Sequence, residues 1–287
     1  MKIPAGLQPL IDDGIIDEVV RQLKSGKEAA VYVVRTGSEV HCAKVYKDMG
    51  QRSFQQRAQY QEGRKVRGSR QARAMAKGTR FGRKEQEAAW KNTEVDVLYQ
   101  LFAAGVRVPQ PFGFFDGVLI MELVTDAEGH SAPRLGEVEF SAAEAREVHQ
   151  FLIGQVVRML CAGLIHGDLS EFNVLVGSQG PVIIDLPQAV NAAGNNNALT
   201  MLQRDVKNLA DTLGRFAPEL YAADYAREMW ALFEQGELKH DTQLAGVFIS
   251  DAPPPDLDDL VLAIDEARDE AVRRQRGRDE AYAHSES

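Results

Sequence analysis

The segment 164–186 constrains the fold of this 287-residue chain more than any other, because oxygen-bearing side chains recur in it at set intervals between short apolar runs. Asp168 is followed five residues later by Asn173, which opens a predicted strand, and seventeen residues later by Asp185, which ends another. Phosphoryl transfer needs a carboxylate for the attacking group and oxygen ligands for Mg²⁺. The spacing matches that need and predicts that the three side chains meet at one metal–nucleotide site.

A plainer interpretation is that Asp168 and Asn173 only cap turns, as Asp and Asn often do. It accounts for each residue singly, but not for His-Gly-Asp at 166–168, the spaced Asn and the Ile-Ile-Asp strand end together. His166 itself is predicted to be a packed, hydrogen-bonded residue rather than a proton carrier.

Lys44 lies in an apolar strand-like run, where an ammonium group is costly to bury unless an anion meets it. ATP phosphates and a helix glutamate would satisfy it. Glu94, at the start of an apolar-periodic helix, is the favoured partner, with Glu85 or Glu87 as alternatives. The plainer interpretation is a lysine at a sheet edge.

The turn after Lys24 has one glycine and small side chains, so that backbone N–H groups and the Ser25 hydroxyl could approach phosphate oxygens. The motif is weak, because it is neither Gly-x-Gly-x-x-Gly nor a Walker A loop. An ordinary hairpin is the alternative.

The first part of the chain is predicted to be a lobe over residues 1–124 that contains an antiparallel sheet and one helix. β-Favouring runs over 15–46 predict its first strands, and the apolar run 118–121 predicts a later one. A stripe of apolar residues within 84–104 predicts a helix that ends at Gly105. The polar, basic insertion at about 49–83 is expected to be a mobile loop or a loosely held helix.

The second part, 125–287, is predicted to be a mainly helical lobe with a charged C-terminal tail. Ser141 and Glu144 form a capping-box pattern that begins a helix extending to about Ala162. Further helices are expected over 199–215 and 222–235. The fold class is therefore α+β, with two lobes around a cleft.

Charge is distributed unevenly along the chain. The formal net charge is −9, but residues 47–91 hold 13 Lys or Arg against 4 Asp or Glu, a local balance of +9. Such a cluster binds polyanions by counterion release, which suggests RNA or a ribosomal particle as a partner. A solvated flexible loop is the alternative.

Cellular location is predicted from cysteines and hydropathy. Cys42 and Cys161 lie in apolar runs without the pairing of a disulfide framework or zinc site, so both are expected to be reduced and buried. No signal peptide and no uninterrupted stretch of about 18 apolar residues is present. We therefore expect a cytoplasmic protein without a membrane span.

Together these motifs resemble the RIO family of atypical serine kinases, over about residues 12 to 215, and are closer to its first subfamily. The segments that carry the resemblance are Ser25-Gly-Lys-Glu-Ala29, Ala43-Lys-Val-Tyr46, the basic insertion, Ala104-Gly-Val-Arg-Val-Pro-Gln-Pro111, His166-Gly-Asp-Leu-Ser-Glu-Phe-Asn173, Ile184-Asp-Leu-Pro-Gln188 and Arg204-Asp-Val-Lys-Asn208.

The resemblance implies a two-lobed protein-kinase-like fold that uses ATP with Mg²⁺ or Mn²⁺, as a serine/threonine kinase, an ATPase or both. Asp168 would be the catalytic carboxylate, and Asn173 and Asp185 the metal ligands. Lys44 would join the phosphates to Glu94. The other nucleotide contacts implied are Ser25 and Lys27 in the turn, and Met121, Glu122 and Leu123 at the hinge that reads adenine. Asp185 could also accept a phosphoryl group.

Two departures from ordinary protein kinases are visible. The His-Gly-Asp triplet lacks their arginine, and no Ala-Pro-Glu segment follows Asp185, so a trimmed C-lobe without a conventional activation segment is expected. Ala30 replaces the Asn usual in the family.

Small-molecule kinases of the aminoglycoside or choline type also use His-Gly-Asp with a spaced Asn and Asp, and they are the alternative function. The protein substrate is not predicted.

Overall fold

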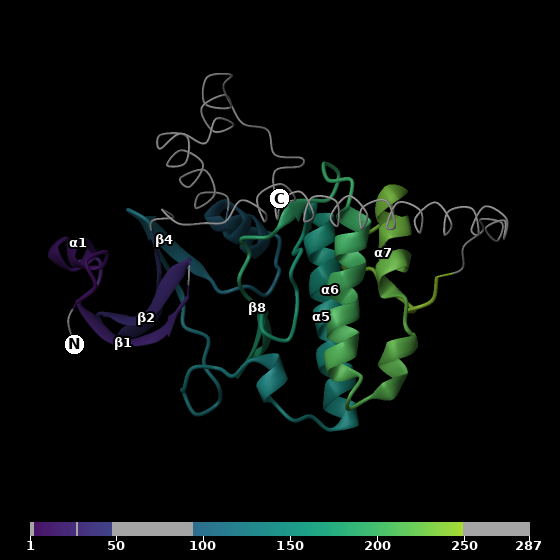
Figure 1. Cartoon of the computed structure of the whole chain (residues 1–287), viewed down its shortest axis with the longest axis horizontal. Coiled ribbons are helices and arrows are strands. Elements are labelled where there is room, and N and C mark those ends of the chain that lie inside the picture. Colours follow the sequence, from purple (N-terminus) through teal and green to yellow (C-terminus); the bar gives the residue numbers. More distant parts are fainter. Residues whose placement is uncertain (1–2, 27, 48–93, 249–287) are drawn as a thin grey trace, which may run out of the picture. The chain divides into compact units, whose positions relative to one another are not determined.

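The computed structural model describes residues 3–26, 28–47 and 94–248, and all but Phe248 of these belong to a single compact unit. We call the described residues up to Val124 the sheet lobe and residues 125–247 the helical lobe (Figure 1). The predictions for Lys27, Glu85, Glu87, the insertion at about 49–83, the basic segment beyond Lys47 and the charged tail fall outside the described residues.

The sheet lobe is built on five antiparallel strands in the order β1-β2-β3-β5-β4. They are β1 (Glu18–Ser25), β2 (Ala29–Thr36), β3 (Glu39–Tyr46), β4 (Pro111–Phe115) and β5 (Val118–Glu122). The predicted strands over 15–46 and 118–121 are therefore confirmed.

The two faces of this sheet have different neighbours, because side chains alternate along each strand. Ala43 and Val45 face a small apolar cluster with residues of the short helix α1 (Gln8–Asp12) and its flanks. Tyr46 and Leu119 belong instead to the main core. Lys44, between Ala43 and Val45 in β3, lies on the second face, which is the face toward the cleft.

A helical segment, 94–103, follows in the described chain and ends before Gly105, whose φ of +73° is readily adopted only by glycine. This agrees with the predicted end of the helix.

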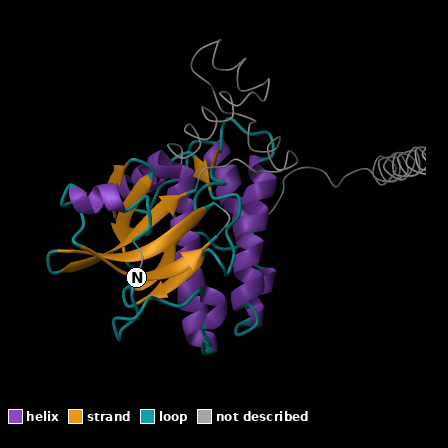
Figure 2. Ribbon diagram, turned by 60° about the vertical axis from the view of Figure 1, so that its left-hand side comes forward, coloured by secondary structure: helices purple, strands orange, loops and turns teal. Residues whose placement is uncertain are grey.

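The helical lobe is organised around α5 (Ala142–Cys161), α6 (Ala198–Leu213) and α7 (Tyr225–Glu234), which lie side by side (Figures 1 and 2). The helix α5 begins as predicted: Ser141 Oγ accepts from Glu144 N (3.3 Å) and Glu144 Oε2 accepts from Ser141 N (2.8 Å). Short elements complete the lobe: β6 (Leu164–Ile165) paired with β9 (Val190–Asn191), β7 (Val174–Gly177) paired with β8 (Gly180–Ile183), and the 3₁₀ turns η2 (Leu135–Glu137) and η3 (Pro218–Ala222).

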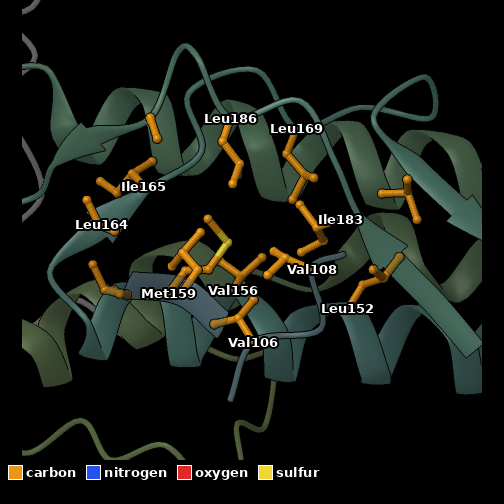
Figure 3. Packing of buried hydrophobic residues seen from close by; sticks show 14 of the residues in the cluster. Val106, Val108, Leu152, Val156, Met159, Leu164, Ile165, Leu169, Ile183 and Leu186 are labelled. Carbon is orange, nitrogen blue, oxygen red and sulfur yellow. The ribbon is translucent and has the colours of Figure 1, made fainter. Parts of the chain in front are cut away.

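In the main core, the inner face of α5 packs against the short strands and loops of segment 164–186. Figure 3 shows Val156 and Met159 of α5 near Ile183, Leu169 and Leu186. Only residues 186–197 separate Asp185 from α6. The helical lobe is therefore trimmed at the place of a conventional activation segment, as expected from the sequence.

Two further expectations can be compared with the structure. Cys42 is buried, but Cys161 is exposed at the last residue of α5, so the prediction that both cysteines are buried was wrong for Cys161. The apolar run around Cys161 predicted burial, but at the end of α5 the Cys161 side chain lies on a part of the helix that is exposed to solvent. Among the described residues, no helix combines the length and apolar character needed to cross a bilayer.

Candidate active site

Lys44 of the sheet lobe contacts Asp185 of the helical lobe across the cleft. Its Nζ lies 2.5 Å from Glu94 Oε1 and 3.3 Å from Asp185 Oδ1, and its side chain is only 14% exposed. Burial opposes the ammonium charge, but the two carboxylates outweigh burial, so the pKa of Lys44 is raised. An ammonium has three N–H donors, which leaves one for a further anion.

The segment between β6 and β7 brings Asp168 and Asn173 together. Asn173 Nδ2 donates to the backbone oxygen of Asp168 (2.9 Å) and lies 3.4 Å from Asp168 Oδ2. The backbone oxygen of Asn173 accepts from Ile184 N (2.9 Å), which fixes it beside the residue that precedes Asp185. The three residues singled out from their spacing thus share one corner of the cleft.

Asp185 follows β8 with a φ of +67°, an uncommon backbone conformation for a residue other than glycine. Its side chain is 49% exposed, and its carboxylate contacts the ammonium group of Lys44. Such strain persists only where the surroundings hold it, and it is often found at functional sites.

Asp205 of α6 supports the loop from below, a role that sequence reasoning did not assign. Its buried carboxylate accepts from Gly167 N (2.8 Å) and Leu169 N (3.0 Å), on either side of Asp168. Burial raises the pKa of Asp205, although these two amides and Arg204 act in the opposite direction. The motif 204–208 was noticed in the sequence, but its spacing from Asp168 gave no sign of this contact.

Other contacts fix the same loop. Arg204 donates to the oxygen of Gly167, and Asn208 Nδ2 donates to that of Leu169 (2.8 Å). Gly167 is needed here, because its φ is +78° and a Cβ would lie 2.7 Å from Gln188 O.

His166 is a packed residue, as the sequence indicated. It is buried, its Nε2 lies 3.1 Å from Ile184 O, and its Nδ1 accepts from Asp168 N (3.3 Å). With Nδ1 as the acceptor, Nε2 is the ring nitrogen that can donate to Ile184 O.

The back of the cleft is a small cavity of about 40 Å³ between Lys44 and Glu94 on one side and Asp185 on the other. Met121 lines this cavity. Leu123 is half-buried. The carboxylate of Glu122 is held by Arg107 (2.6 and 2.8 Å), so contacts from Glu122 to a base would use its backbone.

The turn after β1 is bound by the side chain of Lys47. Ser25 is exposed, and its Oγ accepts from Lys47 Nζ (2.9 Å), which also donates to Gly26 O (2.8 Å). Ser25 pairs with Ala30, which packs in the cluster on the face away from Lys44. Opposed residues of an antiparallel pair share a face, so the structure does not bring the Ser25 hydroxyl toward Lys44.

The donor set at Asn173 and Asp185 fits Mg²⁺, which prefers oxygen ligands and keeps several waters. Asn173 Nδ2 is used within the loop, and among the described contacts its Oδ1 accepts no hydrogen bond. Another oxygen-rich group, Asp126 with Glu128 and His130, is more exposed, and Asp126 Oδ1 already accepts from the amides of Glu128 and His130.

Comparison with known proteins gives a consistent result. Residues 30–226 match the family model described as the RIO domain. "RIO-type serine/threonine-protein kinase Rio1" of Haloferax volcanii is 33% identical over 212 residues, which cover 74% of this chain and 68% of that protein. "Serine/threonine-protein kinase RIO1" of Homo sapiens is 30% identical over 81% of this chain, but the match spans only 39% of the human protein.

A solved structure shows the same fold. The "Rio2 kinase-ADP/Mg2+-phosphoaspartate complex from Chaetomium thermophilum" superposes with a TM-score of 0.51 at 21% identity, over 88% of this chain and 63% of that chain. The two-lobed, kinase-like fold expected from the sequence is confirmed.

Proposed function

This chain belongs to the RIO family, and on that premise we propose that it is a RIO-type serine/threonine protein kinase that uses ATP and Mg²⁺. The observation that carries the proposal is the position of Lys44, within hydrogen-bonding distance of Glu94 and Asp185. The ion pair holds a cation in the cleft beside the oxygen donors of Asn173 and Asp185, which supports binding of ATP phosphates and a metal there.

Each residue of the cleft has a part in this proposal. Lys44 holds the phosphates, and Glu94 holds Lys44. Asn173 and Asp185 hold Mg²⁺, which when bound neutralises charge that develops on the phosphates. Asp168 orients the acceptor hydroxyl and accepts its proton. The backbone of the 121–123 connection binds adenine, and the side chain of Met121 closes the back of the cavity.

The acceptor is proposed to be a protein hydroxyl, because the relatives that match are named serine/threonine-protein kinases. This favours a protein substrate over the amino alcohols of small-molecule kinases.

Replacing Asp185 by Ala tests the proposal. We expect Mg²⁺-dependent ADP release and phosphoryl transfer to a generic protein substrate to fall by about 10²-fold or more, because electrostatic stabilisation of phosphoryl transfer is lost. Lys44→Ala should cost a similar factor by misplacing the phosphates. Both activities are measured on the full chain with labelled ATP.

Glu128→Ala is the control, since Glu128 is a carboxylate that is 79% exposed and does not line the cavity at Lys44, so this variant should retain wild-type turnover. Wild-type turnover in the Asp185 or Lys44 variant would refute the assignment.

A further inference from the structure

Arg107 lies in the link 104–110, which joins the helical segment 94–103 to β4. Its neighbours Val106 and Val108 are buried, and Figure 3 shows both beside α5. The backbone of the link is therefore anchored in the main core, while the Arg107 side chain leaves that core.

The backbone of Arg107 is bound to two parts of the helical lobe. Its N–H donates to Oε1 of the buried Gln155 in α5 (2.7 Å). Its carbonyl accepts from Ile183 N at the end of β8 (2.9 Å). Ile183 lies two residues before Asp185, so the backbone of Arg107 contacts the strand that precedes the proposed metal ligand.

The side chain of Arg107 is bound to the sheet lobe. Nη1 donates to Glu122 Oε2 (2.8 Å) and Nη2 to Glu122 Oε1 (2.6 Å), a two-pronged pair in which both side chains are less than one third exposed. Glu122 Oε2 also accepts from Gln110 N (3.1 Å). The hydrogen bond from Arg107 is the main reason that the pKa of Glu122 is lowered.

Arg107 thus contacts Glu122 in the 121–123 connection and Ile183, two residues before Asp185. The planar fork of arginine fixes both distance and orientation, which a single-point contact does not. We propose that Arg107 is a positioning residue that sets the 121–123 connection at a defined distance from Asp185, so that adenine and the metal-bound phosphates are held together.

This inference rests on the proposed function, because it assigns the two subsites to one nucleotide. The proposal implies that the two subsites are coupled. While the Arg107–Glu122 pair is intact, binding of the adenine base also orders the part of the cleft that binds the phosphates. Without the Arg107–Glu122 pair, each subsite still forms, but one nucleotide can fill both only if the two segments become ordered relative to each other on binding.

The test compares two ligands in Arg107→Gln. We expect the affinity for adenosine, which reports the base subsite alone, to change by less than about twofold. The affinity for ATP with Mg²⁺ should fall by about tenfold, so the ratio of the two affinities falls. Both are measured by calorimetry on the full chain, together with the melting temperature.

Glu122→Gln removes the same pair from the other side and should lower the ratio equally. Because both variants act through one contact, Arg107→Gln/Glu122→Gln should give the same ratio as either single variant.

Arg158→Gln is the matched control. Arg158 donates to Gly105 O in the same link (2.8 Å), but no contact joins it to Glu122 or Ile183 among the described residues. It should leave the ratio unchanged.

An unchanged ratio in Arg107→Gln, an equal fall in Arg158→Gln, or effects that multiply in the double variant would each overturn the positioning role. Absence of Mg²⁺-dependent ATP binding in the wild type would instead refute the proposed function.

Discussion

Polar groups are buried very differently in the two lobes. Of the eight buried polar or charged side chains among the described residues, seven lie in the helical lobe between positions 149 and 212. The sheet lobe has Glu94, which pairs with Lys44. The helical members are His149, Gln155, His166, Asn173, Asn195, Asp205 and Thr212.

The two segments that border the cleft follow the same division. The loop around Asp168 is held from behind by Asp205, His166 and Asn208. In the part of the chain that the structure describes, the side chain that binds the turn at Ser25 and Gly26 is the exposed Lys47. Buried hydrogen bonds are costly to break, whereas an exposed one exchanges easily with water. The loop around Asp168 is therefore held by buried contacts, while the turn at Ser25 is held by an exposed side chain and is freer to adjust.

Asp205→Ala should have the largest effect. It leaves the amides of Gly167 and Leu169 buried without an acceptor, at a cost of about 1–3 kcal/mol each in the free energy of unfolding. Catalytic turnover should fall by about 10²-fold, because Asp168 loses its fixed position. Urea unfolding and phosphoryl transfer measure the two effects.

Asp211→Ala is the control, because Asp211 lies on the same helix in an exposed pair with Lys207 and should change neither quantity appreciably. Near-normal turnover in Asp205→Ala would show that the loop does not depend on support from α6.

Local sequence patterns were sufficient to predict the strands of the sheet lobe, the helix α5 and the proximity of Asp168, Asn173 and Asp185. The spacing of Asp168, Asn173 and Asp185 is set by a short loop and a tight β7–β8 pair, so distance in sequence translates directly into distance in space. The capping box at Ser141 is equally local.

Contacts between distant segments escaped prediction. Asp205 binds amides 36 and 38 residues away, and nothing in a single sequence specifies that pairing. The orientation of the Ser25 hydroxyl depends on the β1–β2 register, which contains shifts before Lys24, so the phosphate contact expected from the sequence stays a prediction. Arg107 lay within a recognised motif, yet its partner Glu122 depends on how the link folds against β5.

His149 tests the opposite case, a buried polar group in the helical lobe that lacks support. It is 1% exposed, its Nε2 has no hydrogen-bond partner within the described part of the chain, and the centre of the Tyr225 ring lies 5.6 Å from that of the imidazole. Burial lowers the pKa of His149 to about 4. The unfolded chain binds the proton below about pH 6.5, the folded protein only near pH 4, so stability is fully present above pH 6.5 and declines as the pH falls.

In His149→Phe this loss should be absent. From pH 7.5 to pH 5 the wild type should lose about 2 kcal/mol more of its unfolding free energy than the variant. Urea unfolding at both pH values measures it. The exposed His130→Gln should behave as the wild type. If His149→Phe loses as much stability as the wild type, His149 is not buried in the neutral form.

Lys47→Gln should have the smallest effect if the turn is adjustable. The amide can replace one of the two hydrogen bonds to Ser25 Oγ and Gly26 O, and water can replace the other, so folding stability should change by less than about 0.5 kcal/mol. The KM for ATP should rise only about two- to threefold, because a turn that is ordered less beforehand must be ordered on binding.

Steady-state kinetics with ATP and urea unfolding measure these changes, and Lys47→Arg, which retains the charge and both donors, serves as the control. A loss in Lys47→Gln as large as that in Asp205→Ala would show that the turn is as firmly pre-arranged as the loop. The contrast between the lobes would then reflect where polar groups are buried, and not how strongly each side of the cleft is held.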